Sequence, residues 1–373
     1  MQKLLTARTA ERLAAIANSP PPINAVVGLD AFVDEIIHVV DKRMSVDSFT
    51  IIQQISDLGT RIVDAAGRST NLELVVERVK LGGNGPIMAN ALSALGPAVT
   101  CVGPLGEPDL HPAFAEIAAR ARIVTLGNPA HTDALEFEDG KLMIGKLETL
   151  NDITWDHIVE RIGQEELVTL FLKSEFVALV NWTMLPHMTE IWRCLLDLLK
   201  TSPKTSGTYF FDLADPEKRG DAAIAEACLL LAQYNQYRRT ILGLNEKEAF
   251  LVGKALGYSG TGHSTRQDVV NVACYISTAL PIETVVVHPR AYAVVASKGQ
   301  LTANVDGPFT DNPLISTGAG DHFNAGFSLG KCFGLSDEEA ATAAVGTSGY
   351  YVRNAASPSL SQLAGFLQSL AGE

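Results

Sequence analysis

Short apolar runs alternate along this chain with longer stretches in which apolar residues recur at helical spacing. The apolar runs predict buried strands at Ile23–Gly28, Val99–Val102, Phe176–Val180, Tyr209–Asp212, Thr240–Leu244 and Thr284–Val287. The helical spacing predicts helices at Gly85–Leu95, Met188–Leu199, Asp221–Gln233, Glu246–Leu256, Arg266–Ala279, Ala319–Phe333 and Asp337–Val352. Regular alternation of strand and helix is typical of a mostly parallel central sheet with helices on both faces, so we expect a three-layer α/β/α fold.

Strand-like, partly polar residues interrupt this alternation in three places. They lie at about 34–50, 70–81 and 131–147, and the last is expected to be a hairpin that turns at Glu138–Lys141. Exposed strands inserted into an α/β core predict a small β lid. Residues 1–19 predict a separate helix, which the prolines at 20–22 end because proline cannot continue a helix. We therefore expect a helical extension over 1–19 and one folding unit with a lid over 20–373.

Composition and charge exclude several classes of protein. The formal net charge of −13 disfavours nucleic acid or an anionic membrane as a partner, and the apolar runs are too short to span a bilayer. A small anionic ligand is not excluded, because backbone amides and a metal ion can reverse the local field. The five cysteines form no CxxC pair, which favours free thiols in a reducing compartment, so we expect a cytoplasmic protein.

The segment Ser316–Asp321 carries the most informative pattern, because small residues there precede a predicted helix. Small residues let the backbone approach a ligand closely, and a helix start presents unpaired N–H groups that favour an anion. The carboxylate of Asp321 at the helix entry is placed to accept a proton from an attacking hydroxyl. Phosphoryl transfer is catalysed mainly by such positioning and electrostatics. The alternative is a glycine-rich turn in which Asp321 is an ordinary helix cap.

Three further segments add polar groups at predicted strand ends or helix starts. Gly82–Gly96 begins with a glycine turn that either approaches a small polar ligand or packs its helix on the sheet. Gly28–Asp34 ends a strand with two carboxylates, where open α/β sheets bind ligands, although solvated loop acids are commoner. Asn245–Glu248 offers an amide and a carboxylate to a hydrated magnesium ion, or forms a plain helix cap.

Taken together and in this order, these segments resemble the ribokinase (PfkB) family of sugar and nucleoside kinases. Ser316–Asp321 is similar to the family's C-terminal GAGD signature, and Gly82–Gly96 to its diglycine signature. Asn245–Glu248 matches its NxxE motif. The resemblance runs from Ile23 to the C-terminus, which would make 20–373 a ribokinase-like kinase domain.

The resemblance implies a role for each matching residue. Asp321 would be the catalytic base, and the amides of Gly318, Ala319 and Gly320 would form an anion hole. Asn245 and Glu248 would hold Mg²⁺, through water. The substrate-binding residues would be Asp34, Asp30, Gly82, Gly83, Asn84 and Asp133. The nucleotide-binding residues would be Asn245, Glu248, His288, Arg290 and Thr317.

The chain also departs from the family pattern. Ile315 replaces an acid associated with a monovalent cation, which argues against activation by such a cation, and Ile87 replaces an asparagine of the diglycine signature. His288-Pro289-Arg290 replaces a Thr-x-Gly motif, and Arg290 is expected either to pair with phosphates or to be an exposed charge. His322, beside the base, is expected to contact a ligand or to lie on the helix surface.

The expected activity is Mg²⁺-dependent transfer of the γ-phosphoryl group of ATP to a hydroxyl of a sugar or sugar-like substrate. Two alternatives on the same fold are an ADP-dependent sugar kinase and a nucleoside kinase, and an aromatic such as Phe32 in the pocket would favour the latter. A protein that binds nucleotide or sugar without catalysis is an alternative of another class. The sequence leaves the oligomeric state open; a homodimer that covers the exposed lid edges is compatible with it.

Overall fold

The computed structural model describes residues 2–202, 206–260 and 265–372. The helices are α1 (Gln2–Asn18), α2 (Ile55–Asp64), α3 (Asn84–Leu95), α4 (Ala115–Ala118), α5 (Trp155–Ile162), α6 (Gln164–Leu167), α7 (Met188–Thr201), α8 (Asp221–Tyr234), α9 (Glu246–Ala255), α10 (Arg266–Ala279), α11 (Ala319–Cys332), α12 (Asp337–Asn354) and α13 (Leu360–Gly372). Shorter turns of helix are η1 (Pro112–Phe114), η2 (Glu148–Asp152), η3 (Val168–Lys173) and η4 (Pro216–Lys218). None of the helices in the described ranges combines the length and hydropathy needed to cross a bilayer.

A nine-stranded sheet forms the centre of the molecule, in the order β14-β13-β12-β11-β10-β9-β1-β5-β6. Its strands are β1 (Asn24–Gly28), β5 (Ala98–Gly103), β6 (Arg122–Thr125), β9 (Phe176–Leu179), β10 (Thr208–Asp212), β11 (Arg239–Leu244), β12 (Thr284–Val287), β13 (Tyr292–Ser297) and β14 (Gln300–Asp306). From β12 to β6 all neighbours are parallel, and antiparallel pairing is confined to one edge, where β13 pairs antiparallel with both β12 and β14. The predicted mostly parallel sheet is confirmed.

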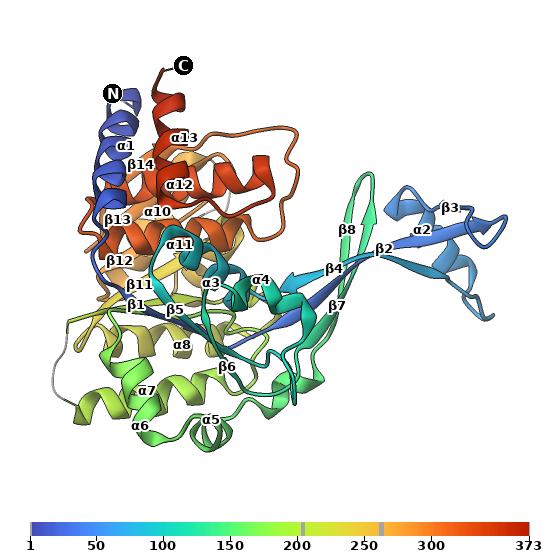
Figure 1. Cartoon of the computed structure of the whole chain (residues 1–373), viewed down its shortest axis with the longest axis horizontal. Helices are drawn as coiled ribbons and strands as arrows, with labels where there is room; N and C mark the ends of the chain where they lie inside the picture. Colours follow the sequence, from blue (N-terminus) through green and yellow to red (C-terminus); the bar gives the residue numbers. More distant parts are fainter. Residues whose placement is uncertain (1, 203–205, 261–264, 373) are drawn as a thin grey trace.

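Alternate side chains of each central strand enter different hydrophobic cores. In β10, Tyr209 and Phe211 join the core beneath α5–α10, whereas Phe210 joins the core beneath α1, α3 and α11–α13. Because both faces are buried, these strands are continuously apolar rather than alternating, which is why the sequence reveals them clearly. Figure 1 shows the two helical layers on either side of the sheet.

A second, five-stranded sheet projects from the body as a long arm (Figure 1). It contains β2 (Phe32–Arg43), β3 (Phe49–Ile51), β4 (Leu74–Gly82), β7 (Ala130–Phe137) and β8 (Gly140–Lys146). These strands largely coincide with the stretches for which the sequence predicts a lid, and we call this sheet the lid. The helix α2 packs Leu58 into a small core of the lid, an element that the sequence pattern did not predict.

The first helix packs against the body and does not stand apart from it. Leu13 of α1 is buried in the same core as Leu363 and Leu367 of α13. Arg8 and Arg12 form ion pairs with the buried carboxylate of Glu339, the third residue of α12. The N-terminal helix therefore covers part of the hydrophobic layer that α12 and α13 lay on the sheet.

Candidate functional site

The segment 316–321 separates two cavities, each of which it helps to line. Thr317, Gly318 and Asp321 line a cavity of about 430 Å³ that also contains residues of the lid. Ser316, Ala319 and Gly320 line a cavity of about 340 Å³ between α11, α12 and the β13 region. One short segment at the start of α11 is therefore the wall between two cavities. We call the first the lid-side cavity and the second the α12-side cavity.

The carboxylate of Asp321 is buried at the floor of the lid-side cavity, with 7% of the residue exposed. It accepts a hydrogen bond of 2.9 Å from Nδ2 of Asn84, at the start of α3. Burial raises the pKa of Asp321 well above its usual value, and the nearby carboxylate of Asp212 raises it further. A carboxylate with a raised pKa and a fixed orientation is suited to accept a proton from a hydroxyl in this cavity.

The proposed anion-hole residues adopt the backbone expected of a ligand-binding turn. Gly318 is left-handed, with φ of +91°, and forms the N-cap of α11. In the described part of the chain no acceptor is found for the N–H groups of Gly318 and Gly320, whereas the N–H of Ala319 donates to the carbonyl of Ser316 at 3.2 Å. The two unpaired amides, together with the start of a fourteen-residue helix, favour a negatively charged ligand here.

The two candidate carboxylates of the Gly28–Asp34 segment have different environments. Asp34 lines the lid-side cavity, where burial raises its pKa and Lys80 opposes that effect. Asp30 is fully buried and does not line this cavity. It accepts hydrogen bonds from the amides of Asn84 (2.9 Å) and Gly85 (2.8 Å) and from Asn181 Nδ2 (2.7 Å), and burial raises its pKa to about 6. The expected substrate contact of Asp30 is thus replaced by a contact with the glycine turn.

The glycines of that turn are required by the closeness of these carboxylates. A Cβ on Gly82 would lie 2.3 Å from Oδ1 of Asp34, and one on Gly83 would lie 2.9 Å from Oδ2 of Asp30. Gly83 also has φ of +91°, and together with Asn84 it lines the lid-side cavity. The diglycine segment therefore lines the lid-side cavity on one side and packs on Asp30 on the other.

Asp133 lies on the opposite face of the lid from the cavity, contrary to the expectation that it contacts substrate. It pairs with Glu35 across β2 and β7, whereas its neighbour Thr132 pairs with Asp34. Successive side chains of a strand point to opposite faces, so Thr132 lines the cavity and Asp133 instead forms an ion pair with Lys146 (2.8 Å). The sequence missed Thr132 by one position.

Asn245 and Glu248 form a complete capping box at the start of α9. The side chain of Asn245 accepts from the Glu248 amide (2.9 Å), and Glu248 accepts from the Asn245 amide (2.8 Å). Asn245 lines the α12-side cavity and Glu248 lines the lid-side cavity. No cluster of three His, Cys, Asp or Glu side chains that could hold a metal ion is found in the described ranges.

Of the five predicted nucleotide residues, Asn245, His288 and Arg290 line the α12-side cavity, whereas Glu248 and Thr317 line the lid-side cavity. The ring of His288 lies 4.7 Å from that of Phe323. Burial lowers the pKa of His288 to about 4, so it is neutral at physiological pH. Arg290 is exposed, with no ion pair in the described residues.

Sequence reasoning missed two charged groups near the base. Asp212 ends β10 and is buried, where it accepts hydrogen bonds of 2.7 Å from Asn324 Nδ2 and from the Ala214 amide. Burial raises its pKa. Lys218 lines the lid-side cavity and is the only cationic side chain among its described lining residues. The end of a strand followed by a turn is the signal that could have identified Asp212; nothing local marks Lys218.

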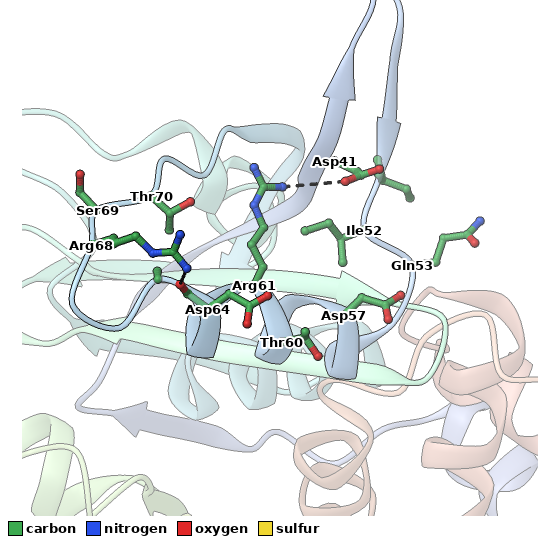
Figure 2. A pocket seen from close by; sticks show the side chains of 12 residues that line it. Asp41, Ile52, Gln53, Asp57, Thr60, Arg61, Asp64, Arg68, Ser69 and Thr70 are labelled. Carbon is green, nitrogen blue, oxygen red and sulfur yellow. Dashed lines mark hydrogen bonds and ion pairs between the residues drawn. The ribbon is translucent and has the colours of Figure 1, made fainter.

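Another cavity, of about 920 Å³, lies in the lid and contains none of the predicted site residues. Figure 2 shows it between α2 and the strands around Asp41 and Ile52. Its two arginines are held locally: Arg61 lies 3.9 Å from Asp41, and Arg68 donates to the carbonyl of Asp64 (3.0 Å). Its acidic residues, Asp41, Asp57 and Asp64, are all exposed, whereas the lid-side cavity contains the buried Asp321, so the lid-side cavity is the better candidate for an active site.

The fold is that of the ribokinase-type kinases. A putative sugar kinase from Clostridium perfringens has a TM-score of 0.63 at 16% identity, covering 94% of this chain and 96% of that one. An adenosine kinase from Sinorhizobium meliloti has a TM-score of 0.62 at 16% identity, covering 94% of this chain and 99% of that one. A putative ribokinase II from E. coli, solved in complex with ATP and Mg²⁺, has a TM-score of 0.62 at 13% identity, covering 93% of this chain and 99% of that one.

The sequence comparisons narrow this class. The chain belongs to the prokaryotic ketohexokinase family, whose model matches residues 6–370. A ketohexokinase from Haloferax volcanii is 28% identical over 346 residues, which are 91% of this chain and 89% of the relative. The protein is therefore a PfkB-type sugar kinase, a phosphotransferase that acts on a sugar hydroxyl, as the resemblance of its motifs predicted.

Proposed function

We propose that this protein transfers the γ-phosphoryl group of ATP to a primary hydroxyl of a ketohexose, with Asp321 as the general base. One observation carries the proposal: the segment 316–321 is the common wall of two cavities, with the buried base on one side. The lid-side cavity holds the sugar and the α12-side cavity holds the nucleotide. The names of the family and of the Haloferax relative support a ketohexose as the acceptor.

Each group in the lid-side cavity has a task in this reaction. Asp34 accepts hydrogen bonds from sugar hydroxyls, Thr132 donates to them or accepts from them, and together they orient the acceptor. Asn84 keeps the carboxylate of Asp321 in one orientation, from which it removes the proton of the attacking hydroxyl. The unpaired amides of Gly318 and Gly320 stabilise the charge on the transferring phosphoryl group. The neutral His288 and Phe323 offer a flat apolar surface to the nucleotide side.

Mg²⁺ fits the carboxylate of Glu248 and the amide oxygen of Asn245 through water, and when bound it neutralises phosphate charge. Glu248 also accepts from the Asp215 amide (2.8 Å), which orients the turn that carries Lys218. In this proposal Glu248 therefore holds the helix start and the neighbouring turn in place around the phosphates.

A coupled assay of nucleotide consumption tests the proposal. The purified protein is given ATP or ADP, Mg²⁺ and one acceptor from a panel of ketohexoses, aldohexoses, ribose and adenosine. Turnover with ATP and a ketohexose, and identification of the phosphorylated carbon by NMR, is the expected result. Adenosine is included because Phe32 lines the same cavity, the feature expected of a nucleoside kinase. Preference for adenosine, or for ADP as donor, would reject the corresponding part of the proposal.

Replacement of Lys218 by methionine is expected to lower kcat roughly 10- to 100-fold, because a cation near the transferring phosphoryl group stabilises its charge. Lys218 follows two left-handed residues, Ala214 (φ +52°) and Asp215 (φ +54°), a rarely adopted conformation that directs η4 over the cavity. Its Nζ contacts Sδ of Met184 at 3.6 Å and has no carboxylate partner in the described residues.

Steady-state kinetics of Lys218→Met with ATP and ketohexose provide the measurement. Lys218→Arg keeps the charge and should recover a large part of the rate. Lys254→Met is the matched control, since Lys254 is an exposed lysine that pairs with Asp221 (2.9 Å) and lines neither cavity. Equal rates for Lys218→Met and Lys254→Met would exclude a role for Lys218 in the reaction.

A further inference from the structure

The carbonyl groups of Thr317 and Gly318, both in the anion-hole turn, form hydrogen bonds with side chains of α12 and α11. The hydroxyl of Tyr351, in α12, donates to the carbonyl of Thr317 at 3.0 Å. Nδ1 of His322, one turn into α11, lies 2.8 Å from the carbonyl oxygen of Gly318. That oxygen also accepts the backbone N–H of His322 at 3.0 Å. Of the two expectations for His322, a position on the helix surface is wrong, because the residue is only 1% exposed; it lines neither the lid-side nor the α12-side cavity.

The hydrogen bonds of His322 determine its tautomer. A carbonyl oxygen can only accept, so Nδ1 carries the proton. Burial lowers the pKa of His322 to about 4, and the ring is therefore neutral at physiological pH. Nε2 then accepts from the hydroxyl of Ser357, 2.9 Å away. The chain of donors runs from Ser357 through His322 to the carbonyl of Gly318.

Tyr351 and His322 also fix each other. Their rings stack with centroids 3.5 Å apart and an interplanar angle of 14°. Both residues are largely buried, with Tyr351 9% and His322 1% exposed, and both line a further cavity of about 370 Å³, so their stacking contact and their hydrogen bonds are what restrain the two rings. We call the pair the His322–Tyr351 brace.

The planar trans peptide transmits this restraint to the amides. In one peptide unit the C=O and the following N–H point in opposite directions. Tyr351 therefore fixes the N–H of Gly318 through the carbonyl of Thr317, and His322 fixes the next peptide through the carbonyl of Gly318. Glycine reverses such a peptide at little cost, so the Gly318 amide needs an external restraint to stay directed at an anion.

We propose that His322 and Tyr351 are positioning residues for phosphoryl transfer: they hold the Thr317–Gly318–Ala319 peptides so that the N–H of Gly318 faces the transferring phosphoryl group. This inference rests on the proposed function and extends it to residues that do not contact substrate. Its physical content is preorganisation, since a donor fixed before the reaction needs no reorientation during it.

The test is Tyr351→Phe, which removes one oxygen and keeps the stacked ring. We expect kcat to fall roughly 10- to 100-fold, part of the cost of losing an oxyanion donor, with the KM for ketohexose unchanged within about threefold. The inhibition constant of ADP with aluminium fluoride, which imitates the transferring phosphoryl group, should rise by a similar factor. His322→Phe should produce the same pattern.

Tyr350→Phe is the matched control. Tyr350 precedes Tyr351 in α12, its ring meets Phe366 edge-on at 5.7 Å, and its hydroxyl has no hydrogen bond within the described residues. Unchanged kcat in Tyr351→Phe would overturn the inference. So would a lower kcat with unchanged inhibition by ADP and aluminium fluoride, because that pattern indicates a smaller folded fraction. If the wild type were inactive with every acceptor, the proposed function would fall first, and this inference with it.

Discussion

Asp321→Asn is expected to lower kcat by roughly 10³- to 10⁴-fold, the upper part of the range for loss of a general base. The amide has nearly the same shape and still accepts the hydrogen bond from Asn84, so the two cavities should be preserved. Only the ability to take a proton is removed. The KM values for sugar and nucleotide should change little, which distinguishes this variant from one that damages binding.

The pH dependence provides an independent check on Asp321. Its folded-state pKa is raised, so the base form, and with it kcat/KM, should increase with pH through that pKa and then level off. A raised pKa also means that ionisation disfavours the folded state. Stability is therefore lost as pH rises above the unfolded pKa of about 3.9, and the neutral Asn should equal or exceed the wild type in Tm at pH 7.

Asp221→Asn serves as the matched control, because Asp221 is an exposed acid in the first turn of α8. Rates come from the coupled assay and Tm from circular dichroism. Near-normal turnover in Asp321→Asn would remove Asp321 as the base. A fall in Tm of many degrees would instead indicate that the carboxylate is structural.

Gly318→Ala is expected to lower kcat about 10²- to 10³-fold, comparable with the removal of an oxyanion donor. The added Cβ would lie 3.0 Å from Cγ2 of Ile87 and 3.2 Å from the hydroxyl of Tyr351. Gly318 also has φ of +91°, which an alanine adopts only with strain. The turn must move to relieve these contacts. The Gly318 amide then moves with it, and the hydrogen bond from Tyr351 to the carbonyl of Thr317 is disturbed.

Gly334→Ala separates backbone strain from damage to the site. Gly334 has φ of +70° with nothing within 4 Å of an added Cβ, just beyond the end of the same helix. The Gly334→Ala substitution should lower the free energy of unfolding by about 1 kcal/mol and leave kcat unchanged. Equal kinetic effects of the two alanines would argue that Gly318 matters only for folding.

The sequence predicted the fold well because the central strands are buried on both faces and the helices keep their spacing. The sequence analysis does not predict the β13–β14 hairpin: the outer strand β14 is largely exposed and carries a weak signal, whereas β13 is a buried apolar run that the pattern could have revealed. In the site, Asp321 and the glycines at 318 and 83 were recognisable because their chemistry is local: a turn, a helix start and a carboxylate within a few positions. The turn could be read from its residues alone.

The rest of the site depends on contacts between distant segments. Asp30 and Asp34 look equivalent in sequence, yet only the fold turns one into the cavity and the other beneath the glycine turn. Which of Thr132 and Asp133 faces the cavity depends on the pairing of β7 with β2, which the local sequence does not determine. Asp212 meets Asn324 across 112 positions of sequence, a contact that no local pattern encodes.

Two lid strands have one end at the lid-side cavity: β2 begins at Phe32, two residues before Asp34, and β4 ends at Gly82, two residues before Asn84. Any change in the tilt of the lid must therefore alter the separation of groups that we expect to contact the sugar. By thermodynamic linkage the converse also holds. A partner that binds the outer part of the lid in one tilt would change the affinity for sugar by some factor. Bound sugar would then change the affinity for that partner by the same factor.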